Sequence, residues 1–123
     1  VAVKWYTKAA EQGYAWAQHN LGLMYDFGLG VLESDKVAVK WYTKAAKQGT
    51  ARSQLNLGTK YHNGSGVLAD YIRSYMWYNL ATFGGSEKGR ERKNNIANKM
   101  TSDDIAKAQE MSSICLASNY TDC

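Results

Sequence analysis

Two histidines and two cysteines are the side chains in this sequence that most often bind metals or act as catalytic bases and nucleophiles. His19 and His62 have no second histidine or paired carboxylate at the spacing of a metal site, so both are interpreted as surface or partly packed residues. No nucleophile motif, phosphate loop or zinc-binding histidine pair occurs, and the glycine pairs recur along the chain as turns would. The sequence therefore predicts no metal site, no cofactor and no enzyme activity.

Cys115 and Cys123 lie close in sequence at the end of the chain. In a straight helix their Cα atoms would be ~12 Å apart, too far for the ~5.5 Å that a disulfide prefers. The polar residues 119–122 favour a turn, so we expect a disulfide that holds the tail against the last helix. Such a bond would indicate an oxidising compartment, such as a periplasm or the cell exterior. Two free thiols in a cytosolic protein are the alternative.

The composition is that of one folded domain. Across 123 residues the chain is 45% hydrophobic and has no proline, which argues against a disordered linker and against a turn-rich β-sandwich. No segment approaches the ~18 apolar residues of a membrane span, so no membrane insertion is expected. The net charge of +4 mildly favours acidic partners.

The sequence repeats itself with a period of 36 residues. "VAVKWYTKAAEQG" at residues 1–13 recurs as "VAVKWYTKAAKQG" at residues 37–49, and Trp5, Trp41 and Trp77 fall in one column. Within a unit, Ala17 and Leu21 belong to one apolar helical face, and a second such face contains the tryptophan. Each unit is therefore expected to be a pair of helices that must stack on its neighbours to bury both faces.

These letters resemble the Sel-1-like repeats, a subfamily of the tetratricopeptide type of α solenoid. The family pattern G-x-A-x-A-x-x-x-L-G-x-x-Y-x-x-G-x-G-V, then D-x-x-x-A-x-x-W-Y-x-x-A-A-x-x-G, matches residues 13–49 almost throughout and residues 49–85 less completely. In the second match Ser53 stands for an alanine, Lys60 for a methionine and Thr82 for an alanine. The resemblance implies an all-α right-handed superhelix, or solenoid, of antiparallel helix pairs, with about seven helices and no sheet.

The pattern divides the single repeat domain, residues 1–123, into five segments. We expect the second helix of a truncated repeat at 1–13, full repeats at 14–49 and 50–85, a divergent capping helix pair at 86–117, and a tail at 118–123. A polar closing pair is expected because an open end of a solenoid would expose apolar surface.

The resemblance also implies a non-catalytic scaffold that binds a protein or peptide on the concave face of the solenoid. In such folds the first helix of each pair lines that face. The candidate partner-binding groove therefore consists of the outward positions of the first helices: Trp16, Asn20, Leu23, Phe27, Arg52, Asn56, Thr59, Asn63, Lys88, Arg92 and Asn95, with Lys99 beyond them. The groove would run from an aromatic end to a basic end, which suits a peptide with an apolar anchor and a carboxylate or acidic run. The alternative is a solvated helix face that happens to be basic.

Other functions compete with the scaffold. The resemblance leaves a hydrolase-like or cell-wall-binding Sel-1-like protein as an alternative, because some members of the wider family carry hydrolase or penicillin-binding labels. The repeated tryptophans and tyrosines could stack on a carbohydrate, but their recurrence in every unit favours a core role. Nucleic-acid phosphates could meet a basic cluster, although Glu87 and Glu91 interrupt it and no nucleic-acid motif surrounds it. That cluster comprises Lys88, Arg90, Arg92, Lys93 and Lys99.

The helix at residues 1–13 has no first helix before it, so the face that would meet one is expected to be open. Trp5 and Tyr6 are expected to be partly exposed there. We therefore expect that Val1 begins a fragment of a longer array, or that another chain, such as a second copy of this one, covers the face.

Overall fold

The computed structural model describes residues 2–123, and within that range it contains seven α-helices and no strand. Val1, where the first predicted helix begins, lies outside the described residues. The predicted all-α fold, with about seven helices and no sheet, is confirmed for the described residues. The helices are α1 (Ala2–Glu11), α2 (Ala15–Phe27), α3 (Asp35–Ala46), α4 (Ala51–Asn63), α5 (Tyr71–Phe83), α6 (Glu87–Ala97) and α7 (Ser102–Ala117).

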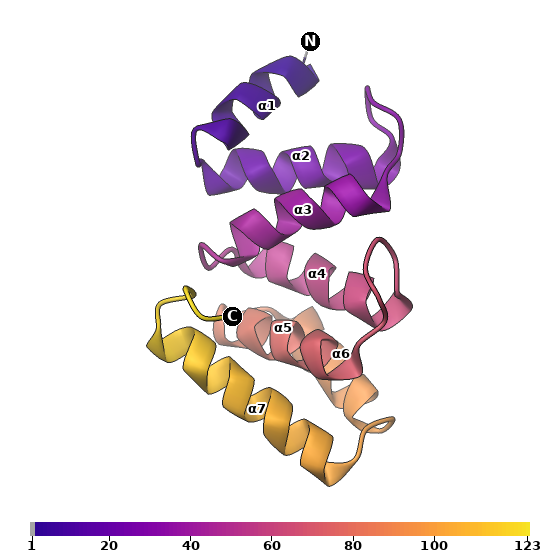
Figure 1. The fold of residues 1–123 in the computed structure, drawn as a ribbon, viewed down its shortest axis with the longest axis vertical. Helices are drawn as coiled ribbons and strands as arrows, with labels where there is room; N and C mark the ends of the chain where they lie inside the picture. The colour runs from indigo at the N-terminus through magenta and orange to yellow at the C-terminus, as the bar shows by residue number, and fades with distance from the viewer. Residues whose placement is uncertain (1) are drawn as a thin grey trace.

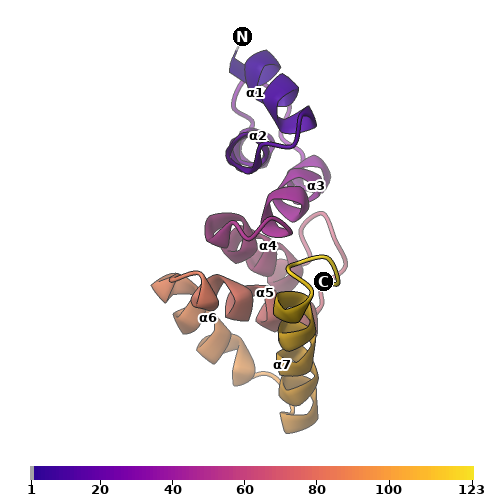
Figure 2. The same cartoon turned by 90° about the vertical axis from the view of Figure 1, so that its left-hand side faces the viewer.

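The helices form an elongated stack that runs from α1 at one end to α7 at the other (Figure 1). Each helix from α1 to α5 packs against the next one in the chain, and α7 packs against α5. Figure 2 shows α2, α4 and α6 along one side of the stack and α1, α3, α5 and α7 along the other. All three helices on which the predicted groove residues lie therefore share one side of the molecule.

Local signals in the sequence set where the helices begin and end. A side-chain oxygen accepts a hydrogen bond from a backbone N–H in the first turn of four helices, which stabilises the helix start. The four capping residues are Ser34, Asp70, Ser86 and Thr101. At the other end, Gly28 and Gly64 follow α2 and α4 in the left-handed conformation, with φ of 66° and 69°. Each glycine therefore stops its helix and turns the chain into the loop that leads to the next one.

The repeated tryptophans and tyrosines form much of the core. Trp41 and Trp77 are 7% and 2% exposed, and Tyr42 is fully buried. This burial confirms the core interpretation for the two complete units. Trp5, in the same column of α1, is 68% exposed, and Tyr6 is half-buried. The expected open face of the first helix is therefore present in the structure.

Two glycines in the first helices allow the helices of each pair to approach closely. A Cβ atom built on Gly22 would lie 2.6 Å from the ring of Tyr42, and one built on Gly58 would lie 2.7 Å from the ring of Tyr78. Real Cβ atoms do not approach other atoms so closely, because the interior is packed at near-crystalline density. In both units the tyrosine ring thus packs directly on the glycine of the first helix, and a larger residue would not fit there.

Glutamines connect the start of each first helix to the end of the helix before it. Gln18 Nε2 donates to the carbonyl of Ala10 at 3.1 Å, and Gln54 Nε2 donates to that of Ala46 at 3.0 Å. Each of these carbonyls, near a helix end, also accepts the backbone N–H of Gly13 or Gly49, so the glutamine supplies its second hydrogen bond. The repeated glutamine therefore fixes how consecutive helices meet.

Ser53 and Lys60, two residues that depart from the family pattern, each bond to a polar side chain of the neighbouring unit. Ser53, which stands for an alanine, has its Oγ 2.7 Å from Nδ1 of His19. His19 is only 4% exposed, so its interpretation as a surface or partly packed residue was wrong. Its burial is possible because Ser53 satisfies one of the two ring nitrogens.

Lys60, which stands for a methionine, is held in an ion pair between helices. Its Nζ lies 2.5 Å from Asp26 in α2 and 2.8 Å from Asp35 at the start of α3. Burial alone would lower the pKa of Lys60, but the hydrogen bonds to the two carboxylates outweigh that effect and raise the pKa above its ordinary value. The lysine is therefore charged in the fold and ties three helices together.

The tail folds back as the positions of the cysteines require. Cys115 and Cys123 form a disulfide with their Cα atoms 4.7 Å apart. Between them, Asn119 and Tyr120 have positive φ values of 54° and 66°, which reverse the chain after α7. The ring of Tyr120 then lies beside Gly49, at the turn between α3 and α4. The tail thus links the closing helix to a unit in the middle of the stack.

Candidate functional site

The candidate site is the side of the stack formed by α2, α4 and α6, which we call the first-helix face. Of the eleven predicted groove residues, some are exposed and the others are partly buried. The exposed ones are Trp16, Phe27, Arg52, Asn63, Lys88 and Asn95. The partly buried ones are Asn20, Leu23, Asn56, Thr59 and Arg92. The face therefore combines accessible side chains with others that are anchored in the fold.

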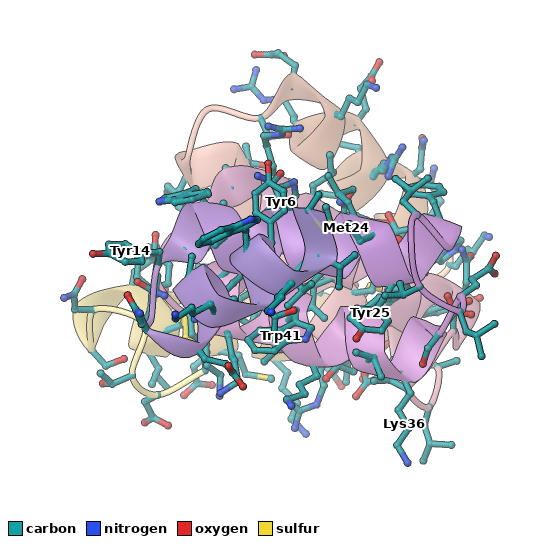
Figure 3. All side chains as sticks on the ribbon, turned by 90° about the horizontal axis from the view of Figure 1, so that it is seen from above. Tyr6, Tyr14, Met24, Tyr25, Lys36 and Trp41 are labelled. Atoms are coloured by element: carbon teal, nitrogen blue, oxygen red, sulfur yellow. A yellow bond between two sulfur atoms is a disulfide. The ribbon has the colours of Figure 1, made fainter. Side chains whose placement is uncertain are left out.

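The α2 end of this face is aromatic. Trp16 is 58% exposed, and its ring centroid lies 6.0 Å from that of Tyr6 in an edge-on arrangement and 6.1 Å from that of Tyr14. Figure 3, viewed from this end of the stack, shows Tyr6 of α1 and, to its left, Tyr14, which precedes α2. Leu23 differs from its neighbours because it packs against the main core cluster. The exposed apolar surface of α2 is thus provided by Trp16 and by Phe27, which is 64% exposed.

The other end of the face contains a cavity of about 260 Å³ between α4, α5 and α6. Three predicted groove residues line it, namely Thr59, Arg92 and Asn95. Lys99, which lies just beyond α6 in the chain, lines it too. The structure therefore brings together side chains from two first helices that are more than thirty residues apart in sequence.

The cavity also contains residues that the sequence did not indicate as groove residues. Tyr78 and Ile96 occupy buried positions of the repeat, and His62 was interpreted only as a surface or partly packed residue. The ring of His62 stacks on that of Tyr71, with the centroids 5.6 Å apart. Because these residues come from three different places in the helical pattern, no single-helix periodicity would have grouped them.

A short hydrogen-bond network fixes one wall of the cavity. Nη1 of Arg92 donates to Oγ1 of Thr59 at 2.8 Å, and the hydroxyl groups of Thr59 and Tyr78 are 2.8 Å apart. Oγ1 of Thr59 also donates to the carbonyl of Leu55 within α4. The guanidinium of Arg92 is therefore held against α4. This bond uses one of its five N–H donors.

The basic character of α6 is only partly free for other contacts. Nζ of Lys93 donates to Oδ1 of Asn79 at 3.4 Å, and Arg92 is bonded to Thr59. Within residues 2–123 neither Arg92 nor Lys99 forms a salt bridge with a carboxylate. Of the cluster considered for nucleic acid, Arg92 and Lys93 bond within the fold, Arg92 and Lys99 line the cavity, and Lys88 and Arg90 are exposed.

His19 is buried beneath the first-helix face and is neutral near pH 7. Burial is the main cause that lowers its pKa from 6.5 to about 4, and the charge of Arg52 lowers it further. His19 is therefore an uncharged part of the packing between α2 and α4 near pH 7. It is bonded to Ser53 and is not available to a partner.

Metal binding and membrane crossing each require a particular arrangement of residues. In the part of the chain that the structure describes, no group of three or more His, Cys, Asp or Glu side chains is placed to hold a metal ion. None of the described helices combines the length and apolar character that crossing a membrane requires. What the face offers is an aromatic surface, hydrogen-bond donors and two unpaired cations beside a cavity.

Comparison with known proteins identifies the repeat. The family model for the Sel1 repeat matches residues 1–14, 17–50 and 51–82. No curated protein matches this chain.

Two solved structures are similar in fold and sequence. One is a protective antigen present in uropathogenic Escherichia coli strains that displays an SLR fold, with a TM-score of 0.90 and 34% identity over 94% of this chain. This chain spans 25% of the length of that antigen. The other is a Sel1 repeat protein from Oxalobacter formigenes, with a TM-score of 0.74 and 36% identity, covering 76% of this chain and 70% of that one.

Proposed function

This chain belongs to the Sel1 repeat family, and on that premise we propose that it is a non-catalytic scaffold that binds a polypeptide partner through the first-helix face. Sel1 repeat folds typically serve as protein-interaction scaffolds. The observation that carries the choice of face is the placement of α2, α4 and α6 along one side of the stack (Figure 2). Their outward side chains form a row of exposed and partly buried residues, of which Leu23 also packs against the main core cluster.

The composition of this row suits a polypeptide. Trp16 and Phe27 are exposed large apolar residues, which are common anchors in protein interfaces. Arg52 and Lys88 are exposed cations on the neighbouring first helices. A partner with an apolar anchor and a negative charge would match both ends of the face.

Asn20 on α2 and Asn56 on α4 are partly buried. A side-chain amide has both a donor and an acceptor, so it can bond to the backbone of an extended peptide. We assign these two residues the role of holding the peptide backbone, while the aromatic and basic residues select its side chains.

The test is a quantitative pull-down from an extract of the organism that encodes the protein. Three baits are compared: the wild-type chain, Arg52→Ala with Arg92→Ala, and Lys44→Ala with Lys107→Ala. The last pair removes the same charge from exposed positions on α3 and α7. We expect partners that the wild type and the α3/α7 variant recover equally and that the first-helix variant loses. Equal recovery by all three baits would refute the assignment of the face.

A further inference from the structure

The cavity between α4, α5 and α6 has the size of a pocket for one residue. Its volume is about 260 Å³, below the ~300–1,000 Å³ of typical small-molecule sites. It opens on the first-helix face, because Thr59 and Asn95 belong to the outward positions of α4 and α6. A polypeptide that lies along that face can therefore place one side chain in it.

The lining of the cavity has two chemical characters. Tyr78 and Ile96, both almost fully buried, supply an apolar floor. Arg92 and Lys99 supply cations, and no aspartate or glutamate is among the lining residues. An occupant that satisfies both parts must present an apolar group and a negative charge within the span of one residue.

Arg92 is pre-positioned for an anion. Its bond to Thr59 and the contact between Thr59 and Tyr78 hold the guanidinium in place without neutralising its charge. A planar guanidinium that is already ordered loses less conformational entropy when it binds a carboxylate. Lys99, exposed at the same cavity, adds a second positive charge.

We propose that this cavity binds the C-terminal residue of the polypeptide partner, with an apolar side chain against Tyr78 and Ile96 and the free carboxylate at Arg92 and Lys99. This proposal rests on the proposed function, since it specifies which part of the partner reaches the first-helix face. An internal aspartate or glutamate would leave the apolar floor uncovered. An internal apolar residue would leave both cations unneutralised. A terminal apolar residue satisfies the two at once.

The test uses two libraries of random octapeptides immobilised through their N-termini, one with free C-terminal carboxylates and one with C-terminal amides. We expect the chain to select peptides from the free-acid library that share an apolar last residue. For the best of these, isothermal titration calorimetry should show that amidation weakens binding at least about tenfold, because a charge-assisted bond to Arg92 is lost.

Variants of the chain locate the effect. Arg92→Gln should weaken binding of the free acid about tenfold and leave binding of the amide nearly unchanged. Arg90→Gln is the matched control, because it removes the same charge from an exposed position of α6 that does not line the cavity. If loss of the Thr59 bond unfolds the Arg92 variant, Lys99→Gln, at an exposed position, takes its place and should weaken binding in the same direction.

Several results would overturn the C-terminal assignment. These are peptides that bind equally well as amides, a selected motif with an internal acidic residue, Arg90→Gln acting as strongly as Arg92→Gln, or no selected peptide from either library. The pull-down with the Arg52 and Arg92 double variant decides the proposed function separately. A partner lost only by that variant would keep the scaffold and its face, even where the C-terminal assignment fails.

Discussion

His19 and Ser53 show how a departure from the repeat at one residue is matched by a departure at another. The positions equivalent to them, one period away, are Leu55 and Ala17. In the structure the two polar side chains bond to each other at 2.7 Å in a buried place. One exchange without the other would bury an unpaired polar group, which costs more than a paired one.

The first prediction follows from this pairing. Ser53→Ala should lower the free energy of unfolding by about 1–3 kcal/mol, because Nδ1 of His19 loses its partner. Adding His19→Leu should recover most of that loss, since the pair is then apolar as at the equivalent positions. Urea denaturation near neutral pH measures both. A double variant that is less stable than Ser53→Ala alone would contradict the account.

A second prediction concerns acid. The pKa of His19 is 6.5 in the unfolded chain and about 4 in the fold, so the unfolded chain takes up the proton first as the pH falls. The associated stability is complete above about pH 6.5 and is lost between there and about pH 4, a loss of about 3 kcal/mol. The wild type should therefore lose more stability between about pH 7.5 and 4.5 than the double variant, which lacks this histidine. Parallel losses in the two proteins would rule out His19 as the group responsible.

At the scale of the helix pair, the contact between Gly22 and Tyr42 gives a prediction with a definite sign. Glycine to alanine inside a helix normally stabilises a protein by about 0.5–1 kcal/mol. Here the new methyl group would lie 2.6 Å from the Tyr42 ring, so Gly22→Ala should instead destabilise by about 1–3 kcal/mol. Gly58→Ala should behave alike, because its methyl group would meet Tyr78 at 2.7 Å. A raised melting temperature in either variant would contradict this packing.

The closing element gives another prediction. Tyr120 N–H donates to the carbonyl of Cys115 at 2.8 Å, and its ring contacts Gly49, so the tail is held by the disulfide, a turn and a contact with the unit at 14–49. Replacing Cys115 with alanine and Cys123 with serine should lower the free energy of unfolding by about 2–3 kcal/mol.

Thermal unfolding with and without a phosphine reductant measures this effect. The reductant should lower the melting temperature of the wild type to near that of the cysteine variant and should leave the variant unchanged. A wild-type melting temperature that is insensitive to the reductant, with the thiols shown to be reduced, would mean that the bond does not support the tail.

The helix pairs could be predicted from the sequence because the signals lie within one helix. The columns of Trp41 and Trp77, the glycines after α2 and α4 and the polar closing helices each follow from local periodicity or capping. The burial of His19 could not be predicted in this way, since its partner Ser53 lies on another helix of the next unit. Contacts between units depend on how one unit is placed on the next, and the periodicity within a helix does not determine that placement.

The candidate site was predictable only in outline for the same reason. The outward positions of α4 and α6 gave Thr59, Arg92 and Asn95, which do line one cavity. Its floor could not be predicted, because Tyr78 belongs to the buried column of α5 and Ile96 to the buried side of α6. That a partner binds there stays a prediction.

Across the whole molecule the two ends of the stack differ. At the α7 end, α5, α6 and α7 pack around the core cluster that contains Tyr78, Ile96 and Ala108, while the tail lies against the middle of the stack. At the α1 end Trp5 is 68% exposed, and Trp16 and Tyr14 are exposed close by. On the first-helix face itself, the exposed aromatic residues Trp16 and Phe27 lie on α2, whereas the basic cavity lies between α4, α5 and α6. A partner on the first-helix face would be bound in one direction only.

The most direct test of the scaffold account is a map of amide chemical shifts in this 123-residue chain, alone and with the partner recovered in the pull-down. We predict that the perturbed amides cluster on α2, α4 and α6, including Trp16, Arg52 and Asn95, while exposed positions of α3 and α7 such as Lys44 and Lys107 stay unchanged. Perturbations confined to α3, α5 and α7 would contradict the central claim that the first-helix face binds the partner.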